Sequence, residues 1–241
     1  MPPSTTIPEL SFFEENYNLL RRREGRTFSD EEVKLLPSVS RKHPLRKEWK
    51  MRSRSSHKLM AWLRKKEMIR ILEAGCGNGW LSHRLSAIPG TEVVGMDING
   101  EELSQARRAF SGITNLQFVH ANLAMLRSEK FDVIVFASSV QYFPSLSGII
   151  REALQQLRPG GEIHIIDSPL YEAGQREPAQ KRSAAYFEKM GFREMNDFYF
   201  HHGLNELHGF DHRILYDPRS HRRGFFSPPN PFFWVCINGV S

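Results

Sequence analysis

Three alternate glycines, Gly75, Gly77 and Gly79, follow a short apolar run over residues 69–72. Glycine has no Cβ atom and tolerates positive φ, so a ligand can approach the bare backbone of such a turn closely. Apolar residues recur at helical spacing over residues 81–88, which places the glycines between a buried strand and a helix. The pattern predicts a ligand-binding turn at the carboxyl end of a parallel strand.

The spacing of these glycines distinguishes the turn from two other nucleotide-binding turns. A nicotinamide-type fingerprint is Gly-x-Gly-x-x-Gly, in which the third glycine packs a helix against a strand. In this chain the third glycine comes one residue early, and Trp80, which is too bulky for that packing, stands in the fingerprint's third position. No Gly-Lys-Ser/Thr follows, so a phosphate-binding P-loop is excluded as well.

A carboxylate, Asp97, ends the next predicted strand, residues 92–97. Its two oxygens can accept hydrogen bonds from the two hydroxyls of a ribose. A nicotinamide enzyme uses an acid in the same place, so Asp97 predicts nucleoside binding without choosing the cofactor. The alternative is an aspartate that only caps the helix beginning at Asn99-Gly100.

The segment Glu73-Ala74-Gly75-Cys76-Gly77-Asn78-Gly79 resembles the acidic-x-Gly-x-Gly-x-Gly motif of class I S-adenosylmethionine-dependent methyltransferases. For the motif alone, a chance run of glycines in a loop is the alternative, but Asp97 and the spacing together favour S-adenosyl-L-methionine (SAM) as cofactor. The resemblance implies that the loop passes under the methionine and ribose parts of SAM. The cofactor-binding residues that it implies are Glu73, Ala74, Gly75, Gly77, Gly79, Asp97, Ile98, Asn122, Leu123 and Ala137.

One of these residues departs from the pattern of the resembled family. Many members have an aspartate at the end of the third strand, where it accepts a hydrogen bond from the adenine amino group, and the matching residue here is Asn122. A neutral amide oxygen can accept the same hydrogen bond but should bind more weakly than a carboxylate. An ordinary turn residue is the alternative.

The resemblance favours a small-molecule acceptor over a nucleobase. Nucleobase amino methyltransferases carry an Asp/Asn/Ser-Pro-Pro-aromatic element after the fourth strand, where this chain reads Ser138-Ser139-Val140-Gln141-Tyr142. The segment Ser227-Pro228-Pro229-Asn230 has a composition similar to that element, but it lies before the last predicted strand. The turn Leu157-Arg158-Pro159-Gly160-Gly161 is frequent among small-molecule methyltransferases and adds support.

Strand and helix patterns alternate from residue 69 onward. This alternation predicts an α/β fold with a doubly wound sheet and ligands at the carboxyl ends of its strands. The resemblance implies a seven-stranded Rossmann-like sheet whose last strand is antiparallel. The predicted strands are 69–74, 92–97, 116–122, 131–137, 162–167, 192–200 and 232–237, and the helices among them are 81–88, 100–110, 147–157 and 177–190.

Residues 1–66 are predicted to be an N-terminal helical extension that caps a methyltransferase domain over residues 67–241. Its predicted helices are 11–23, a capped helix after Ser29, and 46–66. In the resembled family such helices close over cofactor and substrate, which implies that Tyr17, Trp49 and Arg52 bind the substrate.

Residues 41–66 form a strongly basic block in a chain whose net charge is +6. An anionic partner is one interpretation: an acidic substrate, RNA or another nucleic acid, or a membrane surface. A solvated helix face is the other and is favoured, because aromatic residues are not interleaved as a base-stacking platform requires. Apart from Glu48, the charged residues are Arg41, Lys42, Arg46, Lys47, Lys50, Arg52, Arg54, Lys58, Arg64, Lys65 and Lys66.

A histidine-rich segment, residues 201–231, is predicted to be a long substrate-side insertion that covers the acceptor. Metal binding is not expected, because His202 and His208 lack the spacing of a helical zinc pair. Neutral imidazole could accept a proton from the methyl acceptor, so His201 and His202 join Tyr142 as candidate catalytic residues.

The 241-residue chain contains two cysteines and no apolar run long enough to span a bilayer. Its first residues lack the features of a signal peptide, and a cytoplasmic location is expected. The predicted function is methyl transfer by in-line displacement to a small-molecule O-, N- or C-nucleophile. RNA binding or methylation through the basic block, and a non-catalytic cofactor-binding module, are the alternatives; the oligomeric state stays open.

Overall fold

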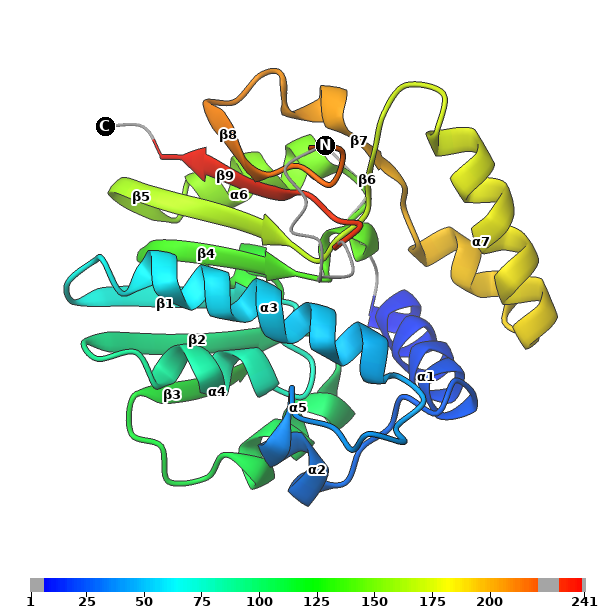
Figure 1. The fold of residues 1–241 in the computed structure, drawn as a ribbon, viewed down its shortest axis with the longest axis horizontal. Helices are drawn as coiled ribbons and strands as arrows, with labels where there is room; N and C mark the ends of the chain where they lie inside the picture. The colour runs from blue at the N-terminus through cyan, green and yellow to red at the C-terminus, as the bar shows by residue number, and fades with distance from the viewer. Residues whose placement is uncertain (1–6, 221–229, 240–241) are drawn as a thin grey trace.

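The computed structural model describes residues 7–220 and 230–239. Its main sheet is seven-stranded, with the order β3-β2-β1-β4-β5-β9-β8. The strands β1 (Ile69–Ala74), β2 (Thr91–Asp97), β3 (Leu116–His120), β4 (Phe131–Ala137) and β5 (Leu157–Ile166) run parallel. The closing strand β9 (Trp234–Asn238) is antiparallel to β5 and to the edge strand β8 (His212–Tyr216). The predicted doubly wound α/β sheet is confirmed (Figure 1).

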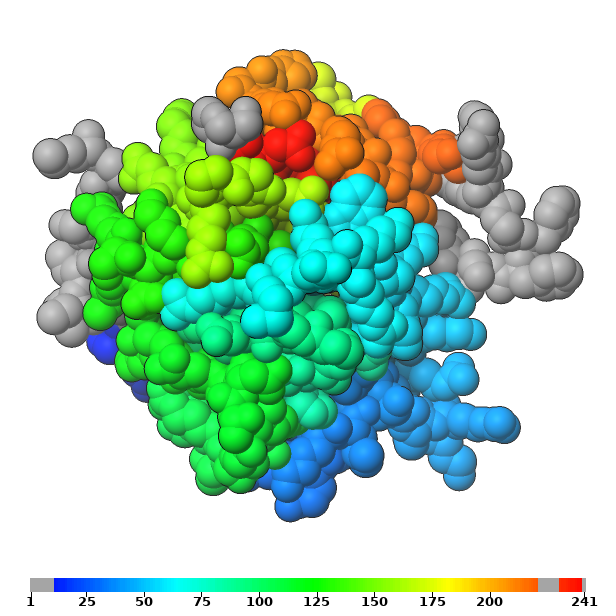
Figure 2. Space-filling model, turned by 90° about the vertical axis from the view of Figure 1, so that its left-hand side faces the viewer, coloured from blue at the N-terminus to red at the C-terminus, as the bar shows by residue number. Residues whose placement is uncertain are grey.

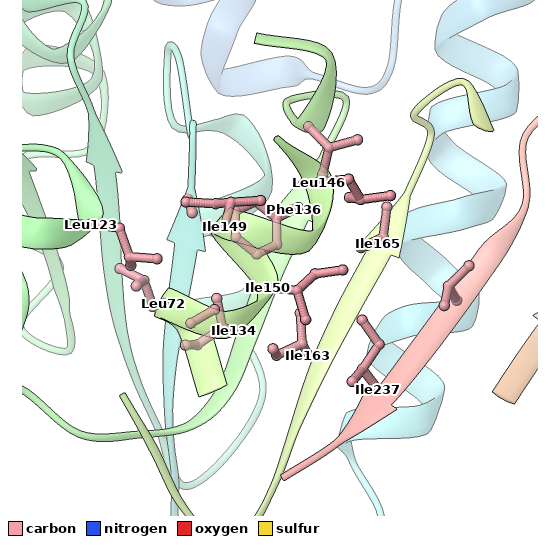
Figure 3. Close-up of a cluster of buried hydrophobic side chains, with 14 of the residues drawn as sticks. Leu72, Leu123, Ile134, Phe136, Leu146, Ile149, Ile150, Ile163, Ile165 and Ile237 are labelled. Carbon is pink, nitrogen blue, oxygen red and sulfur yellow. The ribbon is translucent and has the colours of Figure 1, made fainter. Parts of the chain in front are cut away.

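Helices cover both faces of this sheet, because successive strand residues point to opposite sides. Leu72 packs with Ile150 of α6 (Leu146–Leu154) and Ile163 in one core cluster (Figure 3). Ile71 belongs to the cluster on the other face, with Leu59 and other residues of four helices. These helices are α2 (Asp30–Leu35), α3 (Arg46–Leu63), α4 (Trp80–Ser86) and α5 (Gly100–Ala109).

The order of the strands reverses between β1 and β4. Connections from these two strands leave toward opposite faces, so a crevice opens at their carboxyl ends. The helices α1 (Ile7–Arg23) and α7 (Arg176–Met190) lie at that end, as Figure 1 shows. Figure 2 views the molecule from the amino ends of the parallel strands, where α1 and α7 are mostly hidden.

The N-terminal extension is helical, as predicted. The short helix α2 (Asp30–Leu35) begins at Ser29, whose hydroxyl accepts from Glu32 N while the Glu32 carboxylate accepts from Ser29 N. This reciprocal capping satisfies two helix-end donors. The boundary at residue 66 stays a prediction, since α3 packs directly on the sheet. None of the helices in the described parts of the chain has the length and apolar character of a membrane span.

The C-terminal third contains one wrong prediction. The strand predicted over residues 192–200 is instead the 3₁₀ helix η3 (Arg193–Phe198). Phe192, Met195 and Phe198 recur every third residue, a spacing that puts them on one side of a 3₁₀ helix, and they pack with Phe13 of α1. The sheet position expected for that strand is taken by β8, within the predicted insertion.

Shorter elements complete the chain between the main strands. Two-residue strands β6 (Leu170–Tyr171) and β7 (His202–Gly203) pair in parallel beside the main sheet. The 3₁₀ helices η1 (Leu123–Leu126), η2 (Val140–Tyr142) and η4 (Leu204–Leu207) occupy connections. The positions of β7, η4 and β8 show that much of the segment predicted as an insertion has regular structure.

Candidate active site

The turn after β1 has the backbone conformation that its glycines allow. The φ angles of Gly75, Gly77 and Gly79 are +78°, +53° and +76°. A Cβ atom on Gly75 would lie 2.6 Å from the Cβ of Ser139, and one on Gly79 would lie 2.5 Å from the Phe118 ring. The absence of a Cβ atom at Gly75 therefore leaves room for Ser139, in the connection after β4. Its absence at Gly79 allows helix α4 to pack near β3.

Asp97, at the end of β2, faces this turn. Its Oδ2 accepts from Gly77 N at 2.7 Å, and its Oδ1 accepts from Asn99 N at 2.9 Å. The cap of α5 is Asn99, whose side chain accepts from Glu102 N. Burial raises the pKa of Asp97 above its usual range.

Two adjoining pockets lie around the turn and share Tyr17, Gly75, Gly77, Glu102 and Ser138. The first, the apolar pocket, also contains Asp97 and is walled by Phe13, Met96, Ile98, Ala121, Asn122, Tyr142 and Phe143. The second, the polar pocket, is lined by both basic and acidic side chains: Arg21, Arg26, Glu48, Arg52, Glu73 and Glu102.

Buried carboxyl groups dominate the inner wall of the polar pocket. Burial, together with the charge of Asp97, raises the pKa of Glu73 to about 8 and that of Glu102 to about 7. The Glu73 carboxyl also accepts a hydrogen bond from the Ser82 hydroxyl. Gln141 donates to Ser138 O at 2.6 Å, while its buried Oε1 has no hydrogen-bond partner. These groups suit a ligand that is cationic at this end and donates hydrogen bonds.

A third and larger space, the acceptor cavity, has a volume of about 980 Å³ and opens beside the two pockets. Among the described residues, Ser138 is the one that lines all three spaces. The cavity is enclosed by aromatic side chains and reaches Asp167 at the end of β5. Its aromatic residues are Tyr142, Tyr171, Tyr186, Phe187, Tyr199 and Phe232.

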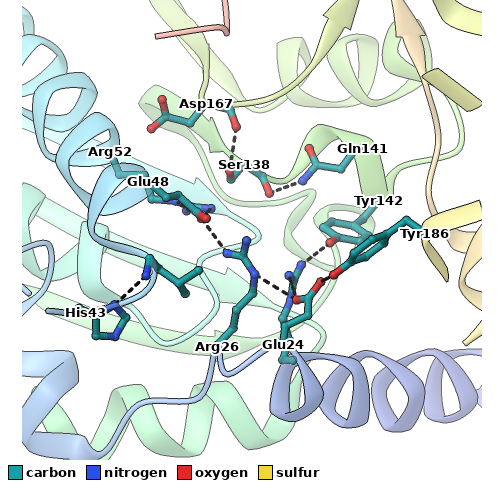
Figure 4. A network of polar contacts seen from close by, with 12 residues as sticks. Glu24, Arg26, His43, Glu48, Arg52, Ser138, Gln141, Tyr142, Asp167 and Tyr186 are labelled. Carbon is teal, nitrogen blue, oxygen red and sulfur yellow. Dashed lines mark hydrogen bonds and ion pairs between the residues drawn. The ribbon is translucent and has the colours of Figure 1, made fainter. Parts of the chain in front are cut away.

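The backbone is strained where β4 and β5 end in this cavity. Ser138 and Asp167 are non-glycine residues with φ angles of +58° and +51°, a region that costs about 1–3 kcal/mol per residue and recurs at functional sites. Ser138 Oγ donates to Asp167 O at 2.7 Å, which joins the two strand ends (Figure 4).

The Asp167 carboxylate is only 4% exposed. Its Oδ1 accepts from Ser55 Oγ at 2.6 Å and from Asn230 Nδ2 at 3.1 Å. Burial raises the pKa of Asp167, and the two donors oppose part of that rise. A carboxyl group held in this way is an oriented proton acceptor at the wall of the cavity.

Residues 65–198, more than half of the chain, match the family model of a methyltransferase domain. The chain belongs to this family of SAM-dependent methyltransferases. A malonyl-[acyl-carrier protein] O-methyltransferase of Enterobacter lignolyticus is 34% identical over 115 residues, covering 47% of this chain and 44% of the relative. A ubiquinone biosynthesis O-methyltransferase of Pseudomonas syringae pv. tomato is 31% identical over 98 residues, 39% of this chain and 42% of the relative. The chain thus spans less than half the length of these curated relatives.

Solved structures support the fold over almost the whole methyltransferase. The CurJ carbon methyltransferase aligns with a TM-score of 0.62 at 16% identity, over 96% of this chain and 69% of that one. The plantazolicin methyltransferase BpumL aligns with a TM-score of 0.58 at 13% identity, over 98% and 100%. At such identities the likeness extends to the fold alone.

The two pockets of the methyltransferase fit SAM. The apolar pocket offers aromatic walls for a base and the Asp97 carboxylate for ribose hydroxyls. The polar pocket offers carboxylates for the ammonium group and guanidinium groups for the carboxylate of an amino acid. Of the predicted cofactor residues, seven line these pockets: Glu73, Gly75, Gly77, Asp97, Ile98, Asn122 and Ala137.

The other three predicted cofactor residues lie behind the pocket walls. Ala74 accepts a hydrogen bond from Ser139 Oγ through its carbonyl, Gly79 contacts Phe118, and Leu123 is buried in the core beneath the sheet. Asn122 lines the apolar pocket, but its side chain caps η1 by accepting from Met125 N at 3.1 Å. Its predicted contact with adenine stays a prediction.

The predicted substrate residues line the two pockets around the glycine turn, and their contact with a substrate stays a prediction. Tyr17 lines both cofactor pockets, Trp49 lines the polar pocket, and Arg52 lines the polar pocket and the acceptor cavity. Burial raises the pKa of the Tyr17 phenol well above its usual range, so this side chain stays neutral.

A chain of ion pairs separates the polar pocket from the acceptor cavity. Arg26 lies between Glu24 and Glu48, at 3.1 and 2.8 Å, and Arg52 pairs with Glu48 at 3.0 Å (Figure 4). Arg21 donates to the Tyr142 hydroxyl at 2.6 Å. The sequence analysis did not single out Arg21, Arg26, Glu48, Ser138, Gln141 or Asp167 as site residues. Two signals were available: Asp167 ends a predicted strand, as Asp97 does, and Ser138 and Gln141 follow the predicted strand 131–137.

Of the predicted catalytic residues, only Tyr142 lies at the cavity. His201 and His202 line a separate hollow beside α7. The ring of His201 contacts Ser183 Oγ at 2.9 Å, and that of His202 contacts Val140 O at 3.0 Å. Burial lowers the pKa of both histidines. The fold therefore does not bring these imidazoles to the junction of cofactor pockets and cavity.

One cluster in the described parts of the chain has the composition of a metal site: Glu162, His164 and Cys236. The indole of Trp234 donates to His164 Nδ1 at 3.1 Å, which leaves the ring proton on Nε2, 3.4 Å from the Glu162 carboxylate. Nδ1 is thereby occupied as an acceptor, whereas Nε2 is buried and has no hydrogen-bond partner; Lys66 also pairs with Glu162. The cluster forms a buried polar network between β5 and β9.

Proposed function

We propose that this methyltransferase methylates a small molecule bound in the acceptor cavity. The observation that carries the proposal is the position of Ser138, which borders the cavity and both cofactor pockets. The volume of about 980 Å³ is near the upper end of the range typical of small-molecule sites. The relatives named as O-methyltransferases support an oxygen acceptor, although they match this chain only in part.

The cofactor supplies a methyl group already activated by its positively charged sulfur. The chain's own residues then have to place the acceptor atom in line with that methyl group and exclude water. We assign the placing to the strand-end residues Ser138, Gln141 and Tyr142, and the exclusion of water to the aromatic walls of the cavity.

Asp167 is the proposed proton acceptor. The Asp167 carboxylate would take the proton that an acceptor hydroxyl or amine loses on methylation and would later release it to water. The methyl–sulfur bond that breaks would leave its electron pair on the sulfur of the cofactor. The hydrogen bonds from Ser55 and Asn230 fix the orientation of the carboxylate. This assignment replaces the one predicted for His201 and His202, and leaves Tyr142 as a positioning residue held by Arg21.

An acceptor screen tests the proposed function. The purified protein is incubated with methyl-labelled SAM and with separate small-molecule, RNA and protein fractions of a cell extract. We expect label in the small-molecule fraction. Label confined to RNA or protein, or binding of the demethylated cofactor without any transfer, would overturn the proposal in favour of the alternatives drawn from the sequence.

A further inference from the structure

We infer that the acceptor carries an anionic group, which lies at the mouth of the acceptor cavity while its nucleophilic atom faces Ser138 and Asp167. The inference rests on the proposed function and deepens it by naming the class of acceptor: a molecule with an aromatic or other apolar body and a carboxylate, sulfonate or phosphate at its far end.

The charges deep in the cavity largely compensate one another. Arg21 and Arg26 both pair with Glu24, and Arg26 and Arg52 both pair with Glu48. These pairs leave little net charge near the cofactor pockets. Asp167 adds a carboxylate on the same inner wall.

The charges at the mouth are not compensated. Arg46, Lys47 and Lys50 project from the first turns of α3, and Arg182 projects from α7 on the other side; all four are exposed. None of them forms an ion pair with another residue in the described ranges, 7–220 and 230–239. The lining as a whole contains seven basic residues, Arg21, Arg26, Arg46, Lys47, Lys50, Arg52 and Arg182, against the three acids Glu24, Glu48 and Asp167.

The walls between the mouth and the inner end are aromatic. Tyr199 packs edge-on against Tyr142, with ring centroids 5.7 Å apart, and against Phe187 at 5.6 Å. Burial raises the pKa of the Tyr199 phenol well above its usual range, so the wall carries no anion that would repel the ligand. Such a surface favours an apolar or aromatic body between the two polar ends.

A small molecule matches this distribution better than a nucleic acid. A nucleic acid would need basic residues along an extended track, together with exposed aromatic side chains on which bases stack. In the cavity the uncompensated cations belong to the exposed part of the lining, and most of the aromatic rings are half-buried or buried. The basic block noted in the sequence thus contributes three cations to the mouth.

A pair of fluorescent probes tests the mouth without knowledge of the acceptor. The anion 8-anilinonaphthalene-1-sulfonate and the neutral N-phenyl-1-naphthylamine share an aromatic body and differ by the sulfonate. Each is titrated into the full chain saturated with S-adenosylhomocysteine. The test variant is Lys47→Glu/Lys50→Glu, and the control is Lys34→Glu/Lys189→Glu, which makes the same charge change outside the cavity.

We expect the test variant to bind the sulfonate probe roughly tenfold to hundredfold more weakly at low ionic strength, since two attractions become two repulsions. Added salt should reduce that difference. The affinities for the neutral probe and for S-adenosylhomocysteine should stay unchanged, as should all affinities of the control variant. Equal binding of the sulfonate by wild type and test variant would overturn the inference.

A second experiment separates this inference from the proposed function. Acids and their neutral amides are offered to the wild-type protein as matched acceptors, with labelled SAM. Transfer to the acids, with a KM that rises with salt, supports the inference. Equal transfer to the neutral partners overturns the inference and leaves the proposed function standing. Transfer to RNA alone, or to no acceptor while S-adenosylhomocysteine binds, overturns the proposed function.

Discussion

Replacing Asp167 by asparagine removes the proposed proton acceptor with little change in shape. The amide oxygen can still accept the hydrogen bonds that Ser55 and Asn230 now donate to Oδ1. General-base catalysis typically contributes a factor of about 10²–10⁴, which corresponds to about 3–5 kcal/mol of transition-state stabilisation. We therefore expect kcat to fall by about that factor, measured as formation of S-adenosylhomocysteine, with an unchanged affinity for that product.

The pH dependence of kcat provides a second test of Asp167, because the direction of the change can be predicted. Only the deprotonated carboxylate can take a proton, and burial raises the pKa of Asp167. In the wild type kcat should rise with pH through that raised pKa and then level off. Ser55→Ala removes a hydrogen bond that lowers the pKa, so the rise should move to higher pH. In Asp167→Asn the rise should disappear.

Folding stability provides the control for Asp167→Asn. A buried acid whose pKa is raised in the folded state costs stability increasingly as pH rises from the ordinary pKa to the raised one. Asparagine removes this cost, so the variant should not unfold at a lower temperature at neutral pH. Glu92→Gln, at an exposed position of β2, should retain the wild-type rate and profile. A kcat of Asp167→Asn within about threefold of wild type would refute the role of Asp167.

Three further predictions concern the cofactor turn and the polar cluster. Gly75→Ala places a Cβ 2.6 Å from that of Ser139 at a φ of +78°; it should cost about 1–3 kcal/mol in thermal unfolding and weaken S-adenosylhomocysteine binding, whereas Gly25→Ala, with open space around it, should leave binding intact. Asp97→Ala should weaken that binding by about tenfold or more in calorimetry, since it removes a charged acceptor worth about 1.5–3 kcal/mol; wild-type affinity would exclude Asp97 from the site. EDTA should leave methyl transfer unchanged, because the Glu162, His164 and Cys236 cluster lines neither the two pockets nor the acceptor cavity, and His164 Nδ1 already accepts from Trp234; a loss restored by Zn²⁺ would contradict this prediction.

The sequence predicted the parallel half of the sheet because its signals are local. Strands such as β4 are nearly continuous apolar runs buried on both faces. The glycines of the turn lie within a single short segment of the sequence. Every residue of the edge strand β8 is half-exposed or exposed, and its apolar run is only Ile214-Leu215-Tyr216, so the strand could not be distinguished from a loop. Phe192 and Phe198, the aromatic residues at η3 that suggested a strand, pack half-buried against α7, which directly precedes them, and against α1, which is distant in sequence.

The residues of the candidate site also fall into those that local sequence patterns predict and those that depend on contacts between distant segments. Gly75 and Asp97 were predicted because each follows a recognisable strand. Asp167 owes its orientation to Ser55 of α3 and to Asn230 near β9, and the strain at Ser138 depends on where β5 ends beside β4. Contacts between segments that are far apart in the sequence produce no local pattern of residue types, so a single sequence does not predict them.

Helix α1 contributes side chains to the apolar pocket, the polar pocket and the acceptor cavity. Tyr17 borders both cofactor pockets, and Arg21 borders the polar pocket and the acceptor cavity. The helix is held at its other side by Glu14, which accepts from Gly100 N at 2.7 Å, and by Asn18, which accepts from Asn99 Nδ2 at 2.7 Å. Movement of this one element would therefore open the cofactor pockets and the acceptor cavity together.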